Sequence, residues 1–430
     1  MSFQQGLSGL NASSKALDTI GNNIANSGTV GYKMSTTQFA DVFAASLSGA
    51  GTAPIGLGAK VATVAQQFTQ GNISVTSNPL DMAINGGGFF RLQSATGDVV
   101  YSRNGQFQLD QSGYIVNSSG YQLTGYAADV NGTINPPLVA LQLFDASSSS
   151  DAAPQATGAS AAALGISASL NLDSREGVPT GTPFNYADAT TYNSSTAVTT
   201  YDSLGNPHIY SLYFVKNATN SWEVYATVSN PAGATPTFTD LSAAGTVALT
   251  TLTFNTDGSI NTGGAPTQAI TAAQLGYAGG VDPMTVPVSF AGTTQFGSLF
   301  TVNSLTQDGF ASGKLAGFSI GDDGVVLGKY TNGQSKNLGQ VILSSFRNAQ
   351  GLQPLGNNLW AASATSGAEL NGEPGSSGQY GPVQSSALED SNVDLTAELV
   401  SMITQQRVYQ ANAQTIKTQD QVLQTLVNLR

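Results

Sequence analysis

Cysteine is absent from this 430-residue chain, and histidine occurs once, as His208. Disulfide bonds, zinc–thiolate sites and thiol nucleophiles are therefore excluded. A site built from several histidines is also excluded, and a Ser-His-Asp triad has one possible base. Because a regular strand would place His208 on one face with Tyr210, Leu212 and Phe214, we interpret it as a half-buried structural residue. These absences disfavour an enzyme, and we expect no catalytic residue, metal or cofactor.

Charge is scarce as well, at 9% of the residues against about 25% in ordinary soluble proteins. The chain has 14 basic and 26 acidic side chains, which argues against nucleic-acid binding because that function needs a clustered basic face. The sequence contains no apolar run of roughly 20 residues, as a membrane span requires, and no readable secretory signal. We therefore expect a chain that does not insert into membranes and whose copies repel one another little.

The N-terminal segment has the pattern of a coiled-coil helix. It contains no proline up to Ala25, and its large apolar residues are spaced alternately four and three apart. The asparagines at 22, 23 and 26, together with Gly28, predict where the helix ends. The apolar heptad positions are Phe3, Leu7, Leu10, Leu17 and Ile24.

The C-terminal segment predicts a second helix of about 35 residues, roughly 50 Å long. It follows the Ser-x-x-Asp capping pattern of Ser391 to Asp394, and no glycine or proline occurs after it. We assign the acidic residues Glu389, Asp390, Asp394 and Glu398 to the start of this helix, where negative charge complements the helix dipole. The apolar heptad positions are Leu395, Leu399, Met402, Tyr409, Ile416, Leu423 and Val427.

Apolar residues of the second helix also lie off these heptad positions, at Ile403, Val408 and Leu426. One helix can cover only one face of its partner. We therefore expect the two terminal helices to pair with each other, and their remaining apolar faces to contact neighbouring copies.

The chain between the helices predicts short β-strands separated by turns. Residues 89–126 and 310–346 both show this pattern of short strands and turns, and Asp322-Asp323 fits a hairpin tip. The glycines 86–88 precede an apolar strand instead of a helix, so we interpret them as a tight turn and not as a phosphate-binding loop. Turns in the first region are predicted at Ala95–Asp98, Arg103–Gly105, Asp110–Gly113 and Asn117–Gly120.

These patterns predict a multidomain, mainly β protein with a long α-helix at each terminus, in which paired coiled-coil helices adjoin nested β domains. In the central block, strands are expected at Thr199–Tyr201, Ile209–Val215 and Trp222–Val228. The predicted parts are a terminal helical domain (1–26 and 389–430), a connecting hinge region rich in Gly, Ser and Ala (27–72 and 361–388), a β domain (73–145 and 292–360) and an inserted β domain (146–291).

Segments from both ends and from the flanking β regions carry a family resemblance. They are Ser8–Ala12, Leu17–Ser27, Gly31–Lys33, Pro79–Phe90, Tyr101–Phe107, Gly339–Leu343, Ala387–Leu395 and Gln410–Lys417. These segments resemble the bacterial flagellar axial proteins, and among them the hook proteins. The resemblance weakens in the central block, where Tyr201–Asn206 and Tyr213-Phe214 are the similar stretches.

The resemblance implies a homopolymer that forms the flagellar hook, a flexible tube that transmits motor torque and serves as an export channel. The terminal helices would line its inner wall through the heptad positions above. The flanking β domain would form the middle layer, and the inserted domain the outer surface. Implied partners are the distal rod protein, the hook cap protein, the hook–filament junction proteins and the flagellar type III export apparatus, through which the chain would leave the cell without a cleaved signal peptide.

Two alternatives stay open at this point. A distal rod subunit would share both terminal segments, and the central insertion favours the hook over the rod. A secreted β-rich adhesin or polysaccharide-acting enzyme belongs to a different class. The enzyme would need a cleft with two convergent carboxylates, whose separation is a property of the folded chain.

Overall fold

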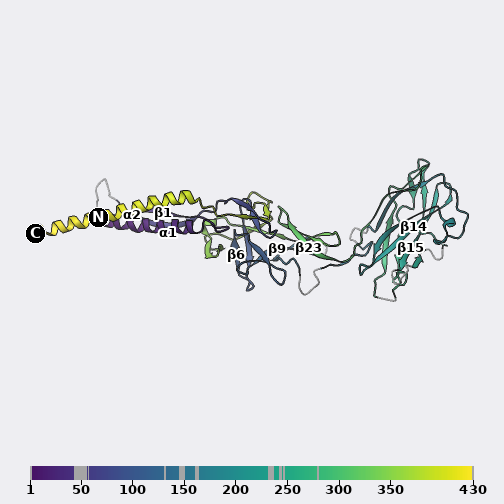
Figure 1. The fold of residues 1–430 in the computed structure, drawn as a ribbon, viewed down its shortest axis with the longest axis horizontal. Coiled ribbons are helices and arrows are strands. Elements are labelled where there is room, and N and C mark those ends of the chain that lie inside the picture. The colour runs from purple at the N-terminus through teal and green to yellow at the C-terminus, as the bar shows by residue number, and fades with distance from the viewer. Residues whose placement is uncertain are drawn as a thin grey trace. The chain divides into compact units, whose positions relative to one another are not determined.

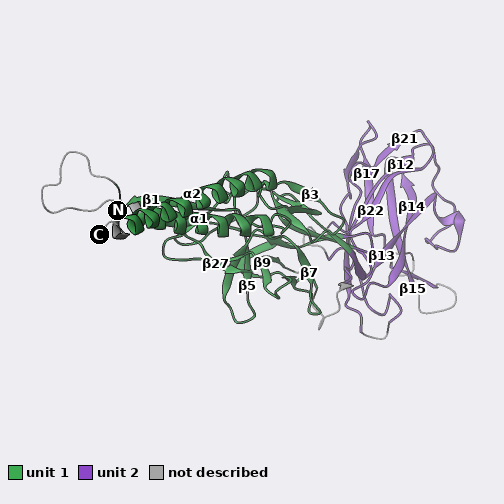
Figure 2. Ribbon diagram, turned by 60° about the vertical axis from the view of Figure 1, so that its left-hand side comes forward, with its two compact units in different colours: residues 1–150, 317–329, 335–430 green, residues 151–316, 330–334 purple. Residues whose placement is uncertain are grey.

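The computed structural model divides the chain into two compact units, coloured green and purple in Figure 2. Unit 1 comprises Met1–Ser150, Gly317–Lys329 and Ser335–Arg430, and unit 2 comprises Asp151–Ala316 and Tyr330–Gln334. The residues described are 2–42, 56, 58–129, 132–144, 151–159, 164–230, 237–241, 245, 247–277 and 280–428.

Unit 1 contains both long helices, α1 (Ser2–Ala25) and α2 (Leu395–Asn428). They lie side by side and run in opposite directions (Figure 1). The two predicted terminal helices and their pairing are thus confirmed. Neither helix, over the residues described, is long and apolar enough to cross a membrane.

The residue that caps α2 is Asp394, not Ser391 of the predicted capping pattern. Its Oδ1 accepts hydrogen bonds from the backbone N–H groups of Thr396 and Ala397, at 2.9 and 3.1 Å. A side-chain oxygen at this position satisfies N–H groups that the first helical turn leaves without partners. The helix therefore begins directly after Asp394.

An antiparallel pair of strands, β1 (Ser35–Val42) and β2 (Gly58–Gln66), packs along α1. The hydroxyl oxygens of Thr19 and Thr37 lie 2.9 Å apart, and the Asn23 amide exchanges two hydrogen bonds with the backbone of Ser35. Residues predicted to belong to a hinge thus form regular structure against the first helix. Whether the segments 27–72 and 361–388 flex stays a prediction.

The β part of unit 1 is built on one large sheet, with the order β23-β24-β25-β9-β5-β6-β28-β27 along its main path. Its core contains buried side chains from both flanking regions of the sequence, among them Phe90, Leu92, Leu123 and Val341. Its strands are β5 (Phe89–Gln93), β6 (Val99–Ser102), β7 (Phe107–Leu109), β8 (Ile115–Asn117), β9 (Gln122–Ala128), β10 (Ile134–Ala140), β23 (Gly313–Ile320), β24 (Val325–Tyr330), β25 (Ser335–Val341), β26 (Leu343–Ser345), β27 (Gln353–Gly356), β28 (Leu359–Ala361) and β29 (Leu370–Gly372). The unit boundaries fall within β23, after Ala316, and at the end of β24, before Tyr330.

Two short antiparallel pairs join the returning chain to the beginning of the β domain. β3 (Ile73–Val75) pairs with β31 (Ala387–Glu389), and β4 (Met82–Ile84) pairs with β30 (Val383–Ser385). A short 3-10 helix, η2 (Ala349–Gly351), precedes β27.

Three of the four predicted turns, Ala95–Asp98, Asp110–Gly113 and Asn117–Gly120, occur between the strands of this sheet, and Arg103–Gly105 lies in the loop between β6 and β7. The backbone N–H groups of Gly97, Gly113 and Gly120 donate to carbonyls three residues earlier, at 2.9 to 3.1 Å. All three glycines have positive φ angles, which a side chain disfavours. The glycines 86–88 form a bend between β4 and β5, with no helix after it, as the sequence predicted.

Unit 2 consists of two sheets that share one hydrophobic core. One sheet has the order β19-β20-β12-β21, with β22 also on β12, and the other has the order β13-β14-β15-β17-β18, with β16 on β15. The strands predicted near Thr199, Ile209 and Trp222 are confirmed as β13, β14 and β15. The elements are β11 (Asp151–Ala152), β12 (Ile166–Asp173), η1 (Ala189–Thr191), β13 (Ser194–Tyr201), β14 (Pro207–Ala218), β15 (Ser221–Asn230), β16 (Thr237–Asp240), β17 (Thr250–Phe254), β18 (Ile260–Thr262), β19 (Thr267–Ile270), β20 (Met284–Ser289), β21 (Thr294–Phe296) and β22 (Thr301–Gln307).

The end of unit 2 differs from the predicted end of the inserted domain at residue 291. β21 and β22 both pair with β12, so residues that the sequence assigned to the flanking domain complete a sheet of unit 2. The unit therefore extends to Ala316. The predicted start, residue 146, lies outside the described residues.

Candidate assembly surface

The face that α1 buries carries small side chains, and it is not the face of large apolar residues predicted from the sequence. Ala12, Ser13 and Ala16 are buried, whereas Phe3 and Leu7 are 46% and 44% exposed. A second row is also spaced alternately three and four apart: Gly6, Ser13, Ala16 and Asn23 in it are buried, and Gly9 and Ile20 are half-buried. The most deeply buried residues of α1 therefore lie beside the predicted heptad row, whose members Leu10, Leu17 and Ile24 are half-buried.

Two glycines explain why the helices approach so closely. A Cβ atom added at Gly6 would lie 3.1 Å from Cγ1 of Ile416, and one added at Gly9 would lie within 3 Å of the Asn412 amide. Small residues at such positions let side chains of the partner helix rest on the backbone. Ile416, predicted as a residue for contacts between copies, thus packs against Gly6 of its own chain and is half-buried.

The second helix exposes large apolar side chains on more than one face. Leu399 and its neighbour Val400 point about 100° apart on a helix, and they are 45% and 60% exposed. A helix of a closed globular domain turns such residues towards the core. The exposed apolar residues of α2 are Leu395, Leu399, Val400, Ile403, Val408, Tyr409, Val422 and Leu423; we call this set the α2 apolar surface.

The predicted self-assembly residues fall into three groups in the structure. Phe3, Leu7, Leu395, Leu399, Tyr409 and Leu423 are exposed. Leu10, Leu17, Ile24, Met402 and Ile416 are half-buried. Val427 belongs to α2, but its side chain lies outside the described residues. Whether these residues contact other copies stays a prediction at this point.

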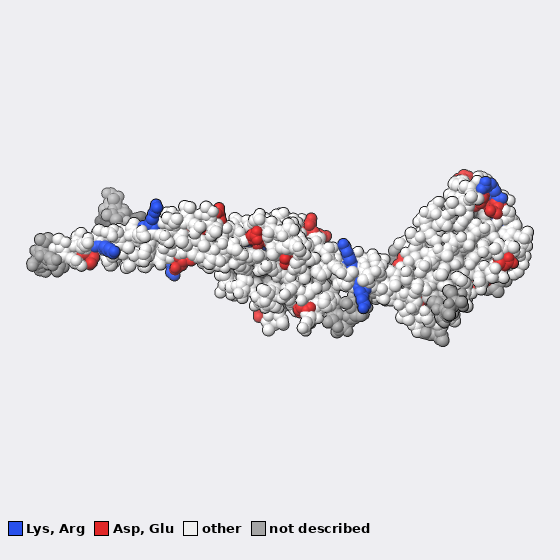
Figure 3. All heavy atoms as spheres, in the orientation of Figure 1, with Lys and Arg blue, Asp and Glu red and all other residues white. Residues whose placement is uncertain are grey.

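Charged side chains are sparse over the face drawn in Figure 3, including the helical part. α1 holds one exposed ion pair, Lys15 with Asp18 at 3.4 Å, and such a pair contributes little to stability. With so few charges, contact between copies would desolvate few ions. The exposed surface of the helices is therefore both apolar and weakly charged.

A buried ion cluster lies where both helices join the β part of unit 1. The Glu389 carboxylate, fully buried in β31, is 2.6 Å from Nζ of Lys33 and 3.2 Å from Nη1 of Arg103. Its Oε1 also accepts a hydrogen bond from the backbone N–H of Gly71, at 2.8 Å. We call Lys33, Arg103 and Glu389 the junction cluster. The sequence interpretation that Glu389 serves the dipole of the last helix is wrong, because this side chain pairs with two cations instead.

Each cation of the junction cluster has a second acceptor. Nζ of Lys33 donates to the carbonyl of Thr69, and Nη2 of Arg103 donates to the carbonyl of Gly86, both at 2.8 Å. Burial lowers the pKa of Lys33 and of Arg103, and the negative charge of Glu389 opposes that shift in both. No local pattern identifies this cluster, because its members come from distant segments.

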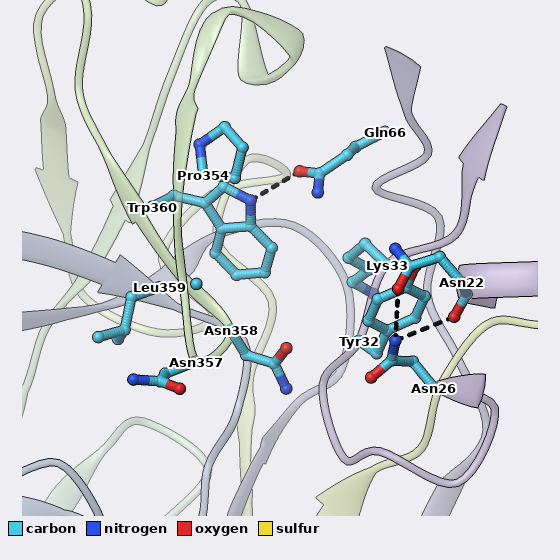
Figure 4. Close-up of a pocket in the computed structure, with 11 residues that line it drawn as sticks. Asn22, Asn26, Tyr32, Lys33, Gln66, Pro354, Asn357, Asn358, Leu359 and Trp360 are labelled. Carbon is cyan, nitrogen blue, oxygen red and sulfur yellow. Dashed lines mark hydrogen bonds between the residues drawn. The ribbon is translucent and has the colours of Figure 1, made fainter. Parts of the chain in front are cut away.

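A cavity of about 210 Å³ lies next to the junction cluster, between the end of α1, the loop at Tyr32 and the turn from β27 to β28 (Figure 4). Two of its polar groups are paired within the cavity wall: the Asn26 amide donates to Asn22 Oδ1 at 2.9 Å, and the indole N–H of Trp360 donates to Gln66 Oε1 at 2.7 Å. The residues that line it include no carboxylate and no histidine.

The other candidates from the sequence occupy structural positions. Oδ1 of Asp323 accepts a hydrogen bond from the backbone of Val325 in the turn between β23 and β24, as expected for a hairpin tip. His208 is fully buried and not half-buried, and its ring nitrogens lie 2.9 Å from the Ser229 carbonyl and 3.2 Å from Oδ2 of Asp202. It shares a buried strand face with Tyr210, as predicted. Among the described residues, no group of three or more acidic or histidine side chains could hold a metal ion.

Family models match four stretches of the chain. Residues 3–33 match the flagella basal body rod protein model, and residues 83–149 match the D1 domain of flagellar hook protein FlgE/F/G. Residues 171–310 match the flagellar basal body protein FlaE D2 domain, and residues 384–429 match the C-terminal region of the flagellar basal body rod FlgEFG proteins. The matches cover both helices, part of the large sheet and most of unit 2.

Relatives match the chain along its whole length. The flagellar hook protein FlgE of Salmonella typhimurium is 45% identical over 432 residues, and that of Escherichia coli is 44% identical over 431 residues; each comparison covers 100% of both chains. Among solved structures, the Helicobacter pylori flagellar hook protein FlgE2 matches 69% of this chain and 96% of its own, with a TM-score of 0.47 and 14% identity.

Proposed function

The chain belongs to the flagellar hook protein family and is a structural subunit of the bacterial flagellar hook, and from that premise we propose that its copies assemble through their terminal helices. The observation that carries this proposal is the α2 apolar surface, which unit 1 leaves uncovered. Burial of apolar area contributes about 25 cal/mol per Å². A second copy placed on this surface would therefore gain a large share of its binding free energy there.

The helices suit the inner wall of a tube because the polymer must be held firmly at one radius. Apolar contacts on several faces of α2 let one helix touch more than one neighbour. We propose that the β part of unit 1 forms the layer outside them, and that unit 2 forms the outer surface. The low charge supports close approach of copies, because a single-sign field would repel them.

We further propose that the hook formed in this way couples the motor to the filament and conducts exported subunits. Its partners would be the distal rod protein, the hook cap protein and the hook–filament junction proteins, and the chain would leave the cell through the flagellar type III export apparatus without a cleaved signal peptide. The family is structural, and we propose no catalytic activity for the chain. The distal rod and the secreted enzyme are not favoured, because the relatives that match the whole chain are hook proteins.

Electron microscopy of the purified protein at raised concentration tests the assembly proposal. Tubes are expected from the full chain, and none from a form that lacks residues 2–26, because that form loses α1 and uncovers the face of α2 that α1 occupies. Circular dichroism should show that the β structure persists in the shortened form. Equal polymerisation of both forms, or monomers in both under every condition, would contradict the proposal.

A further inference from the structure

Backbone hydrogen bonds hold the strand that carries Glu389 from two sides. The carbonyl of Glu389 accepts a hydrogen bond from the N–H of Gly31, and the N–H of Asp390 donates to the carbonyl of Asn72, both at 2.8 Å. β31 also pairs with β3 over its whole length. The segment that follows α1 and the segment that precedes α2 are thus tied to each other.

Asn392 adds a second tie, two residues before the cap of α2. Its Oδ1 accepts a hydrogen bond from the N–H of Met34 at 2.7 Å, and its amide donates to the carbonyl of Gln67 at 2.8 Å and to the hydroxyl of Thr69 at 2.9 Å. One side chain thereby connects three segments, which leaves little freedom for the start of α2.

The junction cluster makes partial opening unfavourable. Arg103 is almost fully buried, and its guanidinium lies 5.3 Å from the ring centre of Phe89 while donating to the Gly86 carbonyl. These contacts keep Arg103 in the β part of unit 1. If Glu389 moved away with the helices, Arg103 would remain as a buried charge without its counter-ion, a state that proteins strongly disfavour.

We propose that the junction is rigid, so that the helices and the β part of unit 1 move as one body. The segments 27–34, 66–72 and 387–392 would then open only when the β part itself unfolds. This inference rests on the proposed function for its consequence, which is that the hook does not bend at the segments 27–34, 66–72 and 387–392.

Hydrogen exchange of the full chain, followed by mass spectrometry, tests this proposal. The amides of Gly31, Gly71 and Asp390 should exchange as slowly as those of β5. Glu389→Gln keeps the shape of the side chain and removes its charge, and we expect exchange in the three junction segments to accelerate at least tenfold while β5 stays protected. The chain has no cysteine, so disulfide cross-linking between copies cannot alter the exchange rates.

Glu369→Gln is the matched control. Glu369 also pairs with an arginine, Arg91 at 3.1 Å, and accepts a hydrogen bond from the Tyr101 hydroxyl at 2.5 Å, but it does not belong to the junction. This variant should leave exchange at Gly31, Gly71 and Asp390 unchanged. Equal acceleration in both variants would overturn the proposal, as would rapid exchange of the junction in the unmodified chain.

A second variant covers the case in which Glu389→Gln does not fold, as judged from β5. Asn392→Ala removes the second tie without stranding a buried charge, and it should accelerate exchange at Met34 and at the start of α2; unchanged exchange there counts against the proposal. Electron microscopy separates the two proposals. Tubes with a rapidly exchanging junction would overturn only the rigid junction, whereas a protected junction in a chain that never polymerises would overturn only the proposed assembly.

Discussion

The terminal helices and unit 2 place their apolar side chains in opposite ways. In unit 2, Trp222, Phe214 and Val286 are fully buried between two sheets of the same chain. In α2, Val400 and Ile403 are 60% and 52% exposed. The difference shows that unit 2 completes its core alone, whereas the helices have apolar surface that their own chain does not cover. Each region can therefore be tested by a substitution that should leave the other unchanged.

Leu399→Asp should have the largest effect, complete loss of tubes in electron microscopy. A charge on the α2 apolar surface would have to be desolvated at every contact between copies that covers it. The free energy of unfolding of the single chain should change by less than about 0.5 kcal/mol, because the side chain is on the surface. Leu399→Met, which stays apolar, should still form tubes. Normal tubes from Leu399→Asp would show that assembly does not need this part of the α2 apolar surface.

Trp222→Ala should destabilise unit 2 by about 3–5 kcal/mol, the usual cost of removing a large buried side chain. The variant also loses the hydrogen bond from the indole N–H to Oε1 of Gln295, at 3.0 Å. Denaturant unfolding followed by far-UV circular dichroism measures the change. Leu299→Ala is the control, because Leu299 belongs to the same unit and is 73% exposed. A similar loss in both variants would mean that unit 2 does not depend on an internal core.

Gly9→Leu should separate α1 from α2 and cost about 1–3 kcal/mol, as overpacking does in a close interface. The added side chain would collide with the Asn412 amide. Gly21→Leu is matched to it in the same helix, since a Cβ atom there meets nothing within 4 Å; it should be neutral or gain up to about 1 kcal/mol from helix propensity. Thermal melting of the helical signal at 222 nm distinguishes the two. An equal effect of both substitutions would show that the small residues of α1 do not set its contact with α2.

The smallest effect concerns pH, and it should occur in unit 2. Side-chain and backbone hydrogen bonds from Arg175 lower the pKa of Asp173 to about 2, from an ordinary value of 3.8. Between these values the unfolded chain binds more protons than the folded one, so stability rises with pH in this window. The contribution should be present above about pH 4 and lost as the pH falls towards 2. Across this range, the free energy of unfolding of Asp173→Asn should depend less on pH than that of the unmodified chain. An equal pH dependence in both would contradict the lowered pKa of Asp173.

Local patterns predicted much of the fold. The two helices, the turns at Gly97, Gly113 and Gly120, and the strands around His208 follow from capping residues, glycines and alternating apolar residues. These signals depend on neighbours along the chain, so a single sequence contains them. The end of unit 2 was not predictable in this way, because residues 294–307 join their sheet by pairing with β12, far away in the sequence.

The sequence by itself determined that each end of the chain forms a helix with more apolar residues than one partner can cover, and that the surface carries few charges. The tertiary structure decided which face of α1 is buried, because Gly6 and Gly9 allow a close approach that hydrophobicity alone does not reveal. It also brought Lys33, Arg103 and Glu389 together in one ion cluster. Their attraction acts through a few ångströms of space, whereas hundreds of residues separate Lys33 and Arg103 from Glu389, and no spacing in the sequence encodes that proximity.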